Sequence, residues 1–389
     1  MTDSSPIFSH KLKIALVCDW YLPQMGGTEM HMRDLADRLQ QEGHEVHVIT
    51  PYPGDEDGES FHIHRLNVPL LPYAGCIYTR SAFRKIESLL KREAFDVVHC
   101  HANIISPTAY GSLYLSRKLG IPAVITWDSI LGPYRWGLAF LDWIYKWSLW
   151  PVLFSGVSEV VAAGVKTLVK NKNVAVLHNA LNVIEWKVTP VERDADEIWI
   201  VSVMRLYRKK RGSALVGIMP EVLERLPSNL RVKLKIIGKG PKRNSLDVQI
   251  KRLGLEGIVE LTGYKTRDEI RELFSRTDIY VQPTRWESFG IAALEARCAG
   301  LPVVAKIKGG VKGFIRHGQE GLLAKSDQEL ADHLVRLITD PKLRESIARH
   351  NREVVPPLDW KEAMREHEAL YRQAIGLVQT ASGKKAEGK

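Results

Sequence analysis

The stretch DIYVQPTRWESFGIAALEARCAGLPVVAK, residues 278–306, contains the alternation that decides the fold. DIYVQPT, at its start, is a short apolar run of the kind found in buried strands. SFGIAALEARCAG is predicted as a helix, and LPVVAK is predicted as the strand that follows it. A helix between two buried strands indicates a crossover unit, in which the two strands are parallel.

The same alternation continues on both sides of this stretch. KIALVCDW, residues 13–20, is predicted as a buried strand, and Met32, Leu35 and Leu39 fall at helical spacing after it. Further predicted strands are EVHVIT, FDVVHCH, IPAVITW, EIWIVSVM and VKLKIIG. Strand and helix alternate along the whole chain, which predicts an α/β fold with doubly wound parallel sheets covered by helices on both faces.

The chain of 389 residues is long enough for two domains, because a single core stops growing near about 250–300 residues. The polar stretch KVTPVERDADE, which contains Pro190, is predicted as the linker between them. Ligands of open sheets bind beyond the carboxyl ends of the strands, so we expect the site along a cleft between the domains. The predicted parts are a first domain over 1–186, a second over 187–357, a C-terminal helix over 358–380 that packs back on the first domain, and a disordered tail over 381–389.

The composition excludes several classes of protein. Hydrophobic residues make up 45% and charged residues 26%, as in soluble globular proteins, so a disordered or fibrous chain is not expected. The four cysteines form no C-x-x-C pair, which argues against a disulfide framework or a zinc site and favours a cytoplasmic protein. The N-terminal MTDSSPIFSHK does not resemble a signal peptide. The net charge of +10 predicts anionic partners: nucleic acid, a phospholipid surface or a nucleoside diphosphate.

Two carboxylates flank the predicted start of the helix in the 278–306 stretch. Glu287 lies in the loop before it and Glu295 within it, and Ser288, Phe289 and Gly290 open it. Amide groups at a helix start bind anions, and Gly290 would let a ligand approach the backbone closely. Carboxylates accept hydrogen bonds from hydroxyl groups. Anion-binding amides between two such carboxylates suit a sugar nucleotide.

These residues and four other blocks resemble glycosyltransferase family 4, a group of retaining enzymes with the GT-B fold of two Rossmann-like domains. The resemblance covers about residues 11–357, and its nearest members are the N-acetylglucosaminyl transferases of glycolipid-anchor synthesis, with phosphatidylinositol mannosyltransferases more distant. It rests on the E-x7-E spacing together with the pair Gly26-Gly27, RLYRKKRG, IIGKGP and LTGY. It implies an acceptor-side first domain and a second domain that binds a nucleotide-sugar donor.

The resemblance also implies roles for individual residues. Gly27, Arg205 and Lys210 would bind the donor diphosphate, whose departing charge must be stabilised in the transition state. Glu295 would hold the ribose, and Glu287 with the amides of Ser288, Phe289 and Gly290 would hold the hexose and the distal phosphate. Such retaining sites often show no protein nucleophile. The family's usual proposal is attack by the acceptor from the leaving-group face, with the phosphate accepting the proton.

Three positions depart from the family pattern. Asp128 stands where the family usually has a histidine, and we take Asp128 and Glu287 as the candidate catalytic residues. Gly313, in GGVKG, replaces the family's acidic residue, which we interpret as a difference in specificity. Arg211 occupies the usual glycine position after Lys210.

Simpler interpretations exist for each feature. Glu287 and Glu295 could be surface carboxylates, the RKKR segment a solvated loop, and Asp128 a helix cap. His101 follows a strand but is as well explained as a structural histidine, so it is not a candidate. The pairs Asp55/Asp57 and Asp194/Asp196 match a D-x-D metal signature but lie in polar loops without a preceding apolar strand, and no metal or other cofactor is predicted.

The segment Tyr134–Phe154 is apolar and rich in tryptophan, but Asp142 and Lys146 interrupt it. None of its uninterrupted apolar parts reaches the length of about 20 residues that a membrane span needs. Three interpretations remain open: a buried helix, an interfacial helix on an anionic membrane, and the wall of a pocket for a lipophilic acceptor.

The predicted function is transfer of a sugar from a UDP- or GDP-hexose to a hydroxyl acceptor, with retention and without metal, by a cytoplasmic enzyme whose peripheral attachment to the membrane face stays open. The acceptor class stays open between lipid, glycan and small molecule. A nucleotide-sugar epimerase and a non-catalytic binding subunit of a membrane transferase complex are the alternatives. Nucleic-acid binding is not expected, because the chain has no basic strand interleaved with aromatic residues and no recognition-helix pattern.

Overall fold

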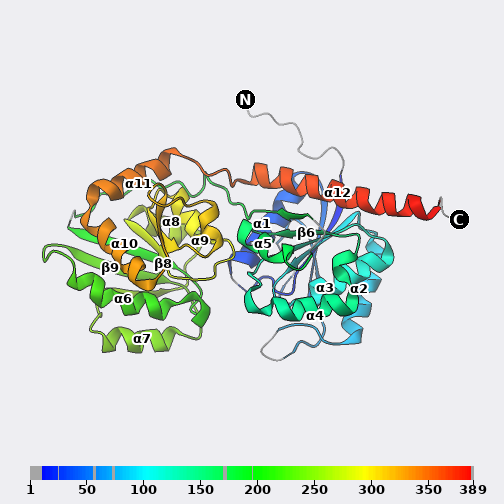
Figure 1. Ribbon diagram of the computed structural model, residues 1–389, viewed down its shortest axis with the longest axis horizontal. Coiled ribbons are helices and arrows are strands. Elements are labelled where there is room, and N and C mark those ends of the chain that lie inside the picture. Colours follow the sequence, from blue (N-terminus) through cyan, green and yellow to red (C-terminus); the bar gives the residue numbers. More distant parts are fainter. Residues whose placement is uncertain are drawn as a thin grey trace. The chain divides into compact units, whose positions relative to one another are not determined.

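The computed structural model describes residues 11–24, 26–55, 58–71, 75–169, 173–194 and 196–386, without the side chains of 133 and 381–386. The expectation about the N-terminal residues 1–10 and the position of Asp57 lie outside the described part. The chain divides into two compact units, residues 1–180 with 358–389 and residues 181–357. Figure 1 shows the elements of each unit.

Unit 1 contains a parallel sheet of seven strands in the order β3-β2-β1-β4-β5-β6-β7. The strands are β1 (Lys13–Val17), β2 (Glu45–Thr50), β3 (His62–Arg65), β4 (Val97–Ala102), β5 (Ala123–Trp127), β6 (Leu153–Gly156) and β7 (Val174–Val176). The helices are α1 (Gly27–Gln41), α2 (Arg80–Glu93), α3 (Pro107–Leu119), α4 (Arg135–Tyr145) and α5 (Glu159–Lys166), with short 3-10 helices η1 (Gly132–Tyr134) and η2 (Trp147–Leu149). Helices α2, α3 and α4 lie on one side of this sheet, and α1 and α12 on the other (Figure 1).

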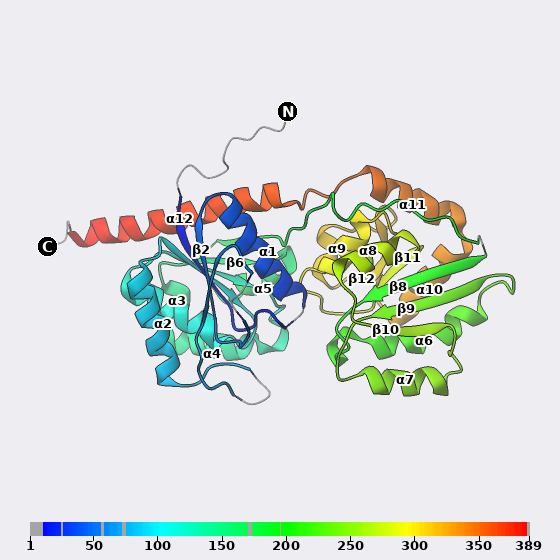
Figure 2. The same cartoon turned by 180° about the vertical axis from the view of Figure 1, so that it is seen from behind.

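Unit 2 contains a parallel sheet of six strands in the order β10-β9-β8-β11-β12-β13. The strands are β8 (Glu197–Val203), β9 (Arg231–Ile237), β10 (Val259–Gly263), β11 (Ile279–Gln282), β12 (Val303–Lys306) and β13 (Gly321–Ala324). The helices are α6 (Gly212–Glu224), α7 (Arg243–Arg252), α8 (Arg267–Ser275), α9 (Ile291–Cys298), α10 (Asp327–Thr339) and α11 (Pro341–Glu353), with short η3 (Arg208–Lys210) and η4 (Gly310–Gly313). Figure 2 shows α6 and α7 on one face of this sheet and α8 and α9 on the other.

The predicted α/β class and the two doubly wound sheets are confirmed. In each sheet the strand order reverses once, between β1 and β4 in unit 1 and between β8 and β11 in unit 2. Loops that leave such a reversal point diverge to opposite faces and leave room for a ligand at the carboxyl ends of the strands. The residues that follow β1, β4 and β5, and those that follow β8 and β11, are therefore the first places to examine for a site.

Helix α12 (Trp360–Ala386) follows unit 2 in sequence but belongs to unit 1. Its residues Trp360, Met364 and Tyr371 are buried in the core formed with β1, β2 and α1. The Tyr371 hydroxyl lies 2.9 Å from Nδ1 of His99 on β4. The helix continues to Ala386, past the end at residue 380 that the sequence analysis expected, and residues 387–389 lie outside the described part.

The division between the units lies between Ala180 and Leu181, earlier than the boundary expected at residue 186. Trp186, in the connecting segment, is buried, and its ring centroid lies 6.0 Å from that of Phe274 on α8. The segment before the polar stretch is therefore anchored in the core of unit 2. The polar composition predicted the exposed part of the segment that connects the two units, but it did not predict the buried part that precedes it.

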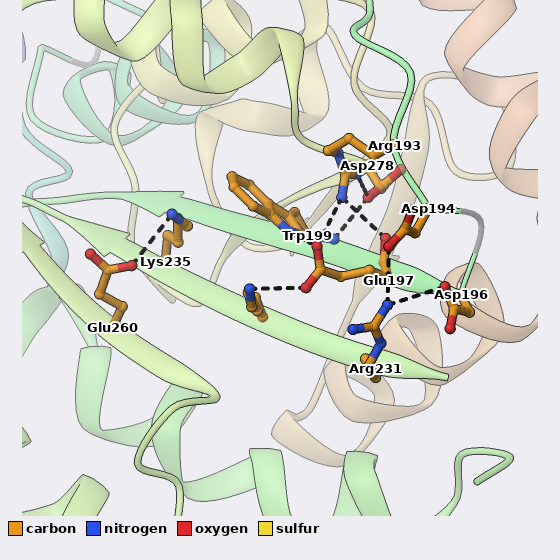
Figure 3. Close-up of polar contacts among 10 residues, drawn as sticks. Arg193, Asp194, Asp196, Glu197, Trp199, Arg231, Lys235, Glu260 and Asp278 are labelled. Carbon is orange, nitrogen blue, oxygen red and sulfur yellow. Dashed lines mark hydrogen bonds and ion pairs between the residues drawn. The ribbon is translucent and has the colours of Figure 1, made fainter. Parts of the chain in front are cut away.

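The polar stretch before β8 is held by a network of charges around Trp199 (Figure 3). Asp194 and Asp196 each lie 3.3 Å from Nη2 of Arg231 on β9. The guanidinium of Arg193 pairs with Asp278 and stacks over the Trp199 ring, 5.0 Å from its centroid. The two aspartates of this D-x-D pair thus help to attach the start of β8 to β9.

Buried neutral imidazoles are expected to make the stability of unit 1 depend on pH. Burial lowers the pKa of His44 and that of His367 from 6.5 to about 4. Below pH 6.5 the unfolded chain therefore binds more protons than the folded chain, and the free energy of unfolding falls as the pH drops from 6.5 through 4. By pH 5 the expected loss is about 2 kcal/mol for each of these two histidines.

The variant His44→Asn tests this expectation. Nδ1 of His44 accepts a hydrogen bond from the Leu12 amide at 3.0 Å, and the asparagine oxygen can take that role without titrating. Urea unfolding at pH 7 and pH 5 should then show a difference in stability about 2 kcal/mol smaller than in the unsubstituted protein. An unchanged difference would mean that His44 does not contribute to acid sensitivity.

Candidate functional site

The loop that follows β8 carries Arg205, and the IIGKG segment after β9 supports that loop. The Met204 amide donates to the carbonyl of Ile237 at 2.9 Å, and the Leu206 amide donates to that of Lys239 at 2.8 Å. Gly238 has φ +139°, and a Cβ there would lie 1.9 Å from the Met204 carbonyl oxygen. A glycine is therefore required where the two loops touch, and this contact positions the backbone at Arg205.

Lys210 ends η3 and reaches Glu287 in the loop after β11. Its Nζ donates to Oε2 of Glu287 at 2.6 Å, and both side chains are mostly buried, with 21% and 15% exposed. The Thr284 hydroxyl donates to the Lys210 carbonyl at 3.4 Å. The fold thus brings together the two residues that the sequence analysis assigned to the diphosphate and to the sugar.

Arg211 stands at the N-cap of α6 with φ +62°, in the left-handed region that favours glycine. This agrees with its place in the sequence, where the family usually has glycine. Its guanidinium pairs with Asp327, whose carboxylate also lies 2.7 Å from Nζ of Lys306 on β12. The side chain is therefore tied to the start of α10 by an ion pair that glycine could not form.

The loop from Glu287 to Gly290 leads directly into α9. The N-cap is Gly290, with φ +100°, and it has no side chain with which to cap the helix. The Gly310 amide donates to the Glu287 carbonyl at 2.7 Å, and a Cβ on Gly310 would lie 2.2 Å from the Ser288 carbonyl oxygen. Glu295 lies on α9 and is 9% exposed. The glycine pair of GGVKG, a segment in which the sequence analysis considered only Gly313, therefore supports the loop that carries Glu287, Ser288 and Phe289.

The variant Gly310→Ala should disturb this loop without changing a charge. The added Cβ must displace the Ser288 carbonyl, because the two atoms would otherwise lie 2.2 Å apart. We expect donor affinity to fall at least tenfold, since amides and carboxylate would no longer face the ligand together. Isothermal titration with the donor measures the loss.

Gly318→Ala is a matched control, because Gly318 also lies in unit 2 and a Cβ there would meet nothing within 4 Å. Its φ of +86° lies in the left-handed region, which Gly310 does not occupy, so this variant adds backbone strain without the steric contact. Equal losses of affinity in the two variants would argue against a specific role of the Gly310 contact.

In unit 1 the structure places Asp128 directly after β5, beside His101 of β4. Oδ2 of Asp128 lies 3.3 Å from Nδ1 of His101, and both side chains are 4% exposed. In the described part of the chain, neither ring nitrogen of His101 has a hydrogen-bond partner, and neither has that carboxylate oxygen. Buried polar atoms without such partners are rare and mark a place where a ligand can supply the missing bonds.

The sequence analysis set His101 aside as a structural histidine. The H-C-H pattern at the end of β4 places His99 and His101 on one face, but it does not distinguish between them. The nitrogens of His99 are engaged by Tyr371 and by the Thr126 hydroxyl, at 2.9 and 2.7 Å, whereas His101 lies at the strand's end. His99 is therefore the structural member of the pair, and His101 belongs to the candidate site.

Two other residues lie at this edge of the first sheet. Asp19, just after β1, accepts from the Thr108 amide at 3.0 Å, and burial raises its pKa above 3.8. Gly27 is the first residue of α1, whose N-cap Gly26 is extended at φ −170°. Gly27 thus lies at a helix start, which is a suitable place to meet an anion. Residue 25 lies outside the described part.

Among the described residues, Glu45, His47 and His62 approach closely enough to hold a metal ion. Nζ of Lys13 lies 2.8 Å from Oε1 of Glu45, and the two ring nitrogens of His47 contact Glu45 and His64 at 2.9 and 2.7 Å. The ammonium group already neutralises the only carboxylate of this group. Glu45 and His47 lie at the start of β2, away from the carboxyl ends of the strands where Asp128 lies.

Comparisons with known proteins identify both halves of the chain. The family "Glycosyltransferase Family 4" matches residues 25–184, and "Glycosyl transferases group 1" matches residues 184–354. The phosphatidylinositol N-acetylglucosaminyltransferase gpi3 subunit of Schizosaccharomyces pombe is 27% identical over 340 residues, which are 84% of this chain and 72% of that protein. The GPI3 subunit of the same enzyme in Saccharomyces cerevisiae is 26% identical over 318 residues, 77% of this chain and 68% of that protein.

Solved structures agree on the fold. HepE of Anabaena, in complex with UDP and glucose, superposes with a TM-score of 0.72 at 19% identity and covers 92% of this chain and 98% of its own. The predicted GT-B architecture is thereby confirmed, and so is the predicted family. The two matches follow one another over residues 25–354, so the chain joins a Glycosyltransferase Family 4 domain to a group 1 glycosyl transferase domain and is a sugar-transferring enzyme with two Rossmann-like domains.

Proposed function

We propose that this glycosyltransferase takes its sugar from a UDP-hexose and transfers it to a hydroxyl group with retention of configuration and without a metal ion. The observation that carries the proposal is the contact between Lys210 and Glu287 at 2.6 Å. It joins a cation suited to a diphosphate with a carboxylate suited to sugar hydroxyls. The choice of UDP is supported by HepE, which was solved with UDP and glucose.

The proposed roles follow from the chemistry of each group. Arg205 and Lys210 neutralise the charge that develops on the departing diphosphate, as a metal ion would otherwise do. The amides of Ser288, Phe289 and Gly290 bind the distal phosphate at the open start of α9. Glu287 accepts hydrogen bonds from the sugar, and Glu295, partly accessible on α9, accepts those of the ribose.

In unit 1, Gly27 at the start of α1 contributes an amide to the diphosphate. Asp128 stabilises positive charge that develops on the sugar ring, and His101, whose Nδ1 lies 3.3 Å from the carboxylate, is proposed to position it when the ligand is bound. No side chain is assigned as a nucleophile. The proton of the acceptor hydroxyl passes to the leaving phosphate, as in the family's usual proposal.

The acceptor is proposed to be a lipid with a hydroxylated head group, reached at the cytoplasmic face of a membrane. The support is the name of the relatives, which describes transfer of N-acetylglucosamine to phosphatidylinositol. Among the described residues no helix is both long enough and apolar enough to cross a bilayer. We propose that contact with the membrane is peripheral.

Thermal unfolding in EDTA, with a panel of nucleoside diphosphates and nucleotide sugars, tests the proposal. UDP and one UDP-sugar should stabilise the protein by about 2.7 kcal/mol at a hundredfold excess over the dissociation constant. The stabilisation should disappear in Glu295→Gln and Arg205→Met. Stabilisation by GDP alone would reassign the base, and a strict requirement for Mg²⁺ would contradict the metal-free mechanism.

A second candidate is a binding subunit without turnover of its own, because the relatives are named as subunits. Donor binding in the thermal assay, together with no hydrolysis or transfer by the isolated chain, would favour this candidate. Release of UDP in the presence of a phosphatidylinositol vesicle would favour the enzyme.

A further inference from the structure

Helix α4 (Arg135–Tyr145) is apolar and yet almost wholly exposed. Leu138 is its one buried residue among those described. Trp136, Phe140 and Trp143 expose 72%, 60% and 76% of their surface, and Leu149 after the helix exposes 68%. A soluble protein rarely leaves large aromatic groups exposed over one contiguous segment, so this surface has a partner.

A cavity of about 390 Å³ lies beneath the exposed helix. Helix α3 contributes Tyr110 and Tyr114 to its lining, β5 contributes Trp127, and α4 contributes Leu138 and Tyr145. Its size falls in the range of small-molecule sites, and its lining is almost entirely hydrocarbon and aromatic. Cavities of this kind hold no ordered water, since water needs two or more polar partners. A hydrocarbon chain is the ligand that matches such a lining.

The rim of this region is basic. Arg117 of α3 lies over the ring of the cavity residue Trp150, 5.1 Å from its centroid, and Arg135 lies over Trp136 at 5.3 Å. Lys146, exposed, follows the helix. Asp142 accepts bonds from the amide and hydroxyl of Ser148 at 2.7 and 2.8 Å and is thereby occupied locally. Aromatic residues flanked by arginine and lysine are the composition of helices that lie in the interface of an anionic membrane.

We propose that α4 lies in the surface of an anionic membrane and that the cavity beneath it holds one hydrocarbon chain of a membrane lipid. The exposed aromatic side chains enter the interfacial region, the basic rim faces the phosphate groups, and the chain enters between α3 and α4. Trp127 lines the cavity and precedes Asp128 in the chain, so a bound lipid lies close to the candidate catalytic edge of unit 1.

This inference deepens the proposed function and rests on its lipid acceptor, but lipid binding itself needs neither donor nor transfer. Lipid binding can be absent from a protein that UDP still stabilises, and it can be present in a protein that UDP does not stabilise. Each buried methylene adds roughly a fourfold factor in affinity, so a chain that loses two or three methylenes of contact binds about 15- to 60-fold more weakly.

The cavity is tested with parinaric acid, a fluorescent fatty acid, in titrations of the full chain. The cavity tryptophans should transfer excitation energy to the bound probe, with saturation near one probe per chain. Leu138→Trp fills the cavity and should weaken binding more than about tenfold, whereas Leu138→Met preserves volume and should bind as before. Circular dichroism shows whether each variant is folded. No saturable binding, or equal binding by a folded Leu138→Trp variant, would overturn the cavity assignment.

The membrane surface is tested by co-sedimentation with vesicles of phosphatidylcholine, with and without phosphatidylglycerol. Binding should require phosphatidylglycerol, weaken with added salt and fall at least tenfold in the double variant Trp136→Ser, Trp143→Ser. Val248→Ser removes an apolar residue that is 66% exposed on α7 and should leave binding unchanged. If the protein is instead a dimer that the double variant dissociates, or if neither vesicle binds, the assignment of this surface to a membrane is wrong.

Discussion

Replacing Lys210 with methionine is expected to lower kcat/KM for sugar transfer about 100- to 1000-fold. The ammonium group lies 2.6 Å from Glu287 in a site that is mostly shielded from water, where a fixed charge acts strongly on a developing one. Methionine keeps the length of the side chain but cannot stabilise the departing diphosphate. The loss should appear mainly in kcat, because the charge on the leaving oxygen increases in the transition state. Steady-state release of UDP measures it.

Arg208→Met provides the control, since Arg208 is an exposed cation two positions away in the same 3-10 helix. This variant should keep kcat/KM within about threefold of the original value. Glu287→Gln is measured alone and combined with Lys210→Met. The two losses in kcat/KM should not add in the double variant, because each side chain holds the other in place. Additive losses, or equal losses in Arg208→Met and Lys210→Met, would contradict a specific role of Lys210.

Replacing Asp128 with asparagine should reduce kcat about 100-fold or more while leaving donor affinity nearly unchanged. Asparagine has the shape of aspartate but lacks the charge that would stabilise a positive sugar ring. The simpler interpretation of Asp128 as a helix cap makes the opposite prediction, because asparagine caps helices as well as aspartate does. Kinetics and donor titration on the folded variant therefore distinguish the two roles.

His101→Asn should produce a smaller loss of kcat than Asp128→Asn, because His101 is proposed to position the carboxylate rather than to meet the sugar. Asp37→Asn is the control and should keep kcat, because Asp37 is a half-buried carboxylate on α1 that accepts hydrogen bonds from Gln41 and Ser60. A larger loss in His101→Asn than in Asp128→Asn would make the histidine the residue that contacts the reacting groups, in place of Asp128.

The loops of unit 2 could be predicted from sequence because their constraints are local. Glycines in IIGKG and GGVKG must accept close backbone contacts, and an E-x7-E spacing places one carboxylate before a helix and one inside it. The structure shows the reason for two of these glycines: added Cβ atoms would lie 1.9 Å from the Met204 oxygen and 2.2 Å from the Ser288 oxygen. A short motif can specify such contacts, because only glycine fits where another backbone atom lies so close.

His101 could not be selected in the same way. Its sequence context, a histidine at the end of a buried strand, is shared by His99, whose nitrogens are fully engaged. The difference depends on Tyr371, which lies 272 positions away in the C-terminal helix. No local pattern indicates which of two alternating histidines a distant helix will engage.

The sequence by itself determined the α/β class, the two parallel sheets and the family, and it singled out the candidate residues in the loops of unit 2. Alternating strands and helices, and glycines at close contacts, are constraints that act over a few residues. Only the tertiary structure decided that Lys210 reaches Glu287, that His101 rather than His99 joins Asp128, and that α4 is exposed above an apolar cavity. The sequence of residues 134–154 allowed burial, membrane contact or a pocket wall, because hydrophobicity drives a helix out of water without specifying what covers it. Which of the three applies depends on the side chains that pack against the helix, and these come from elements far away in the sequence.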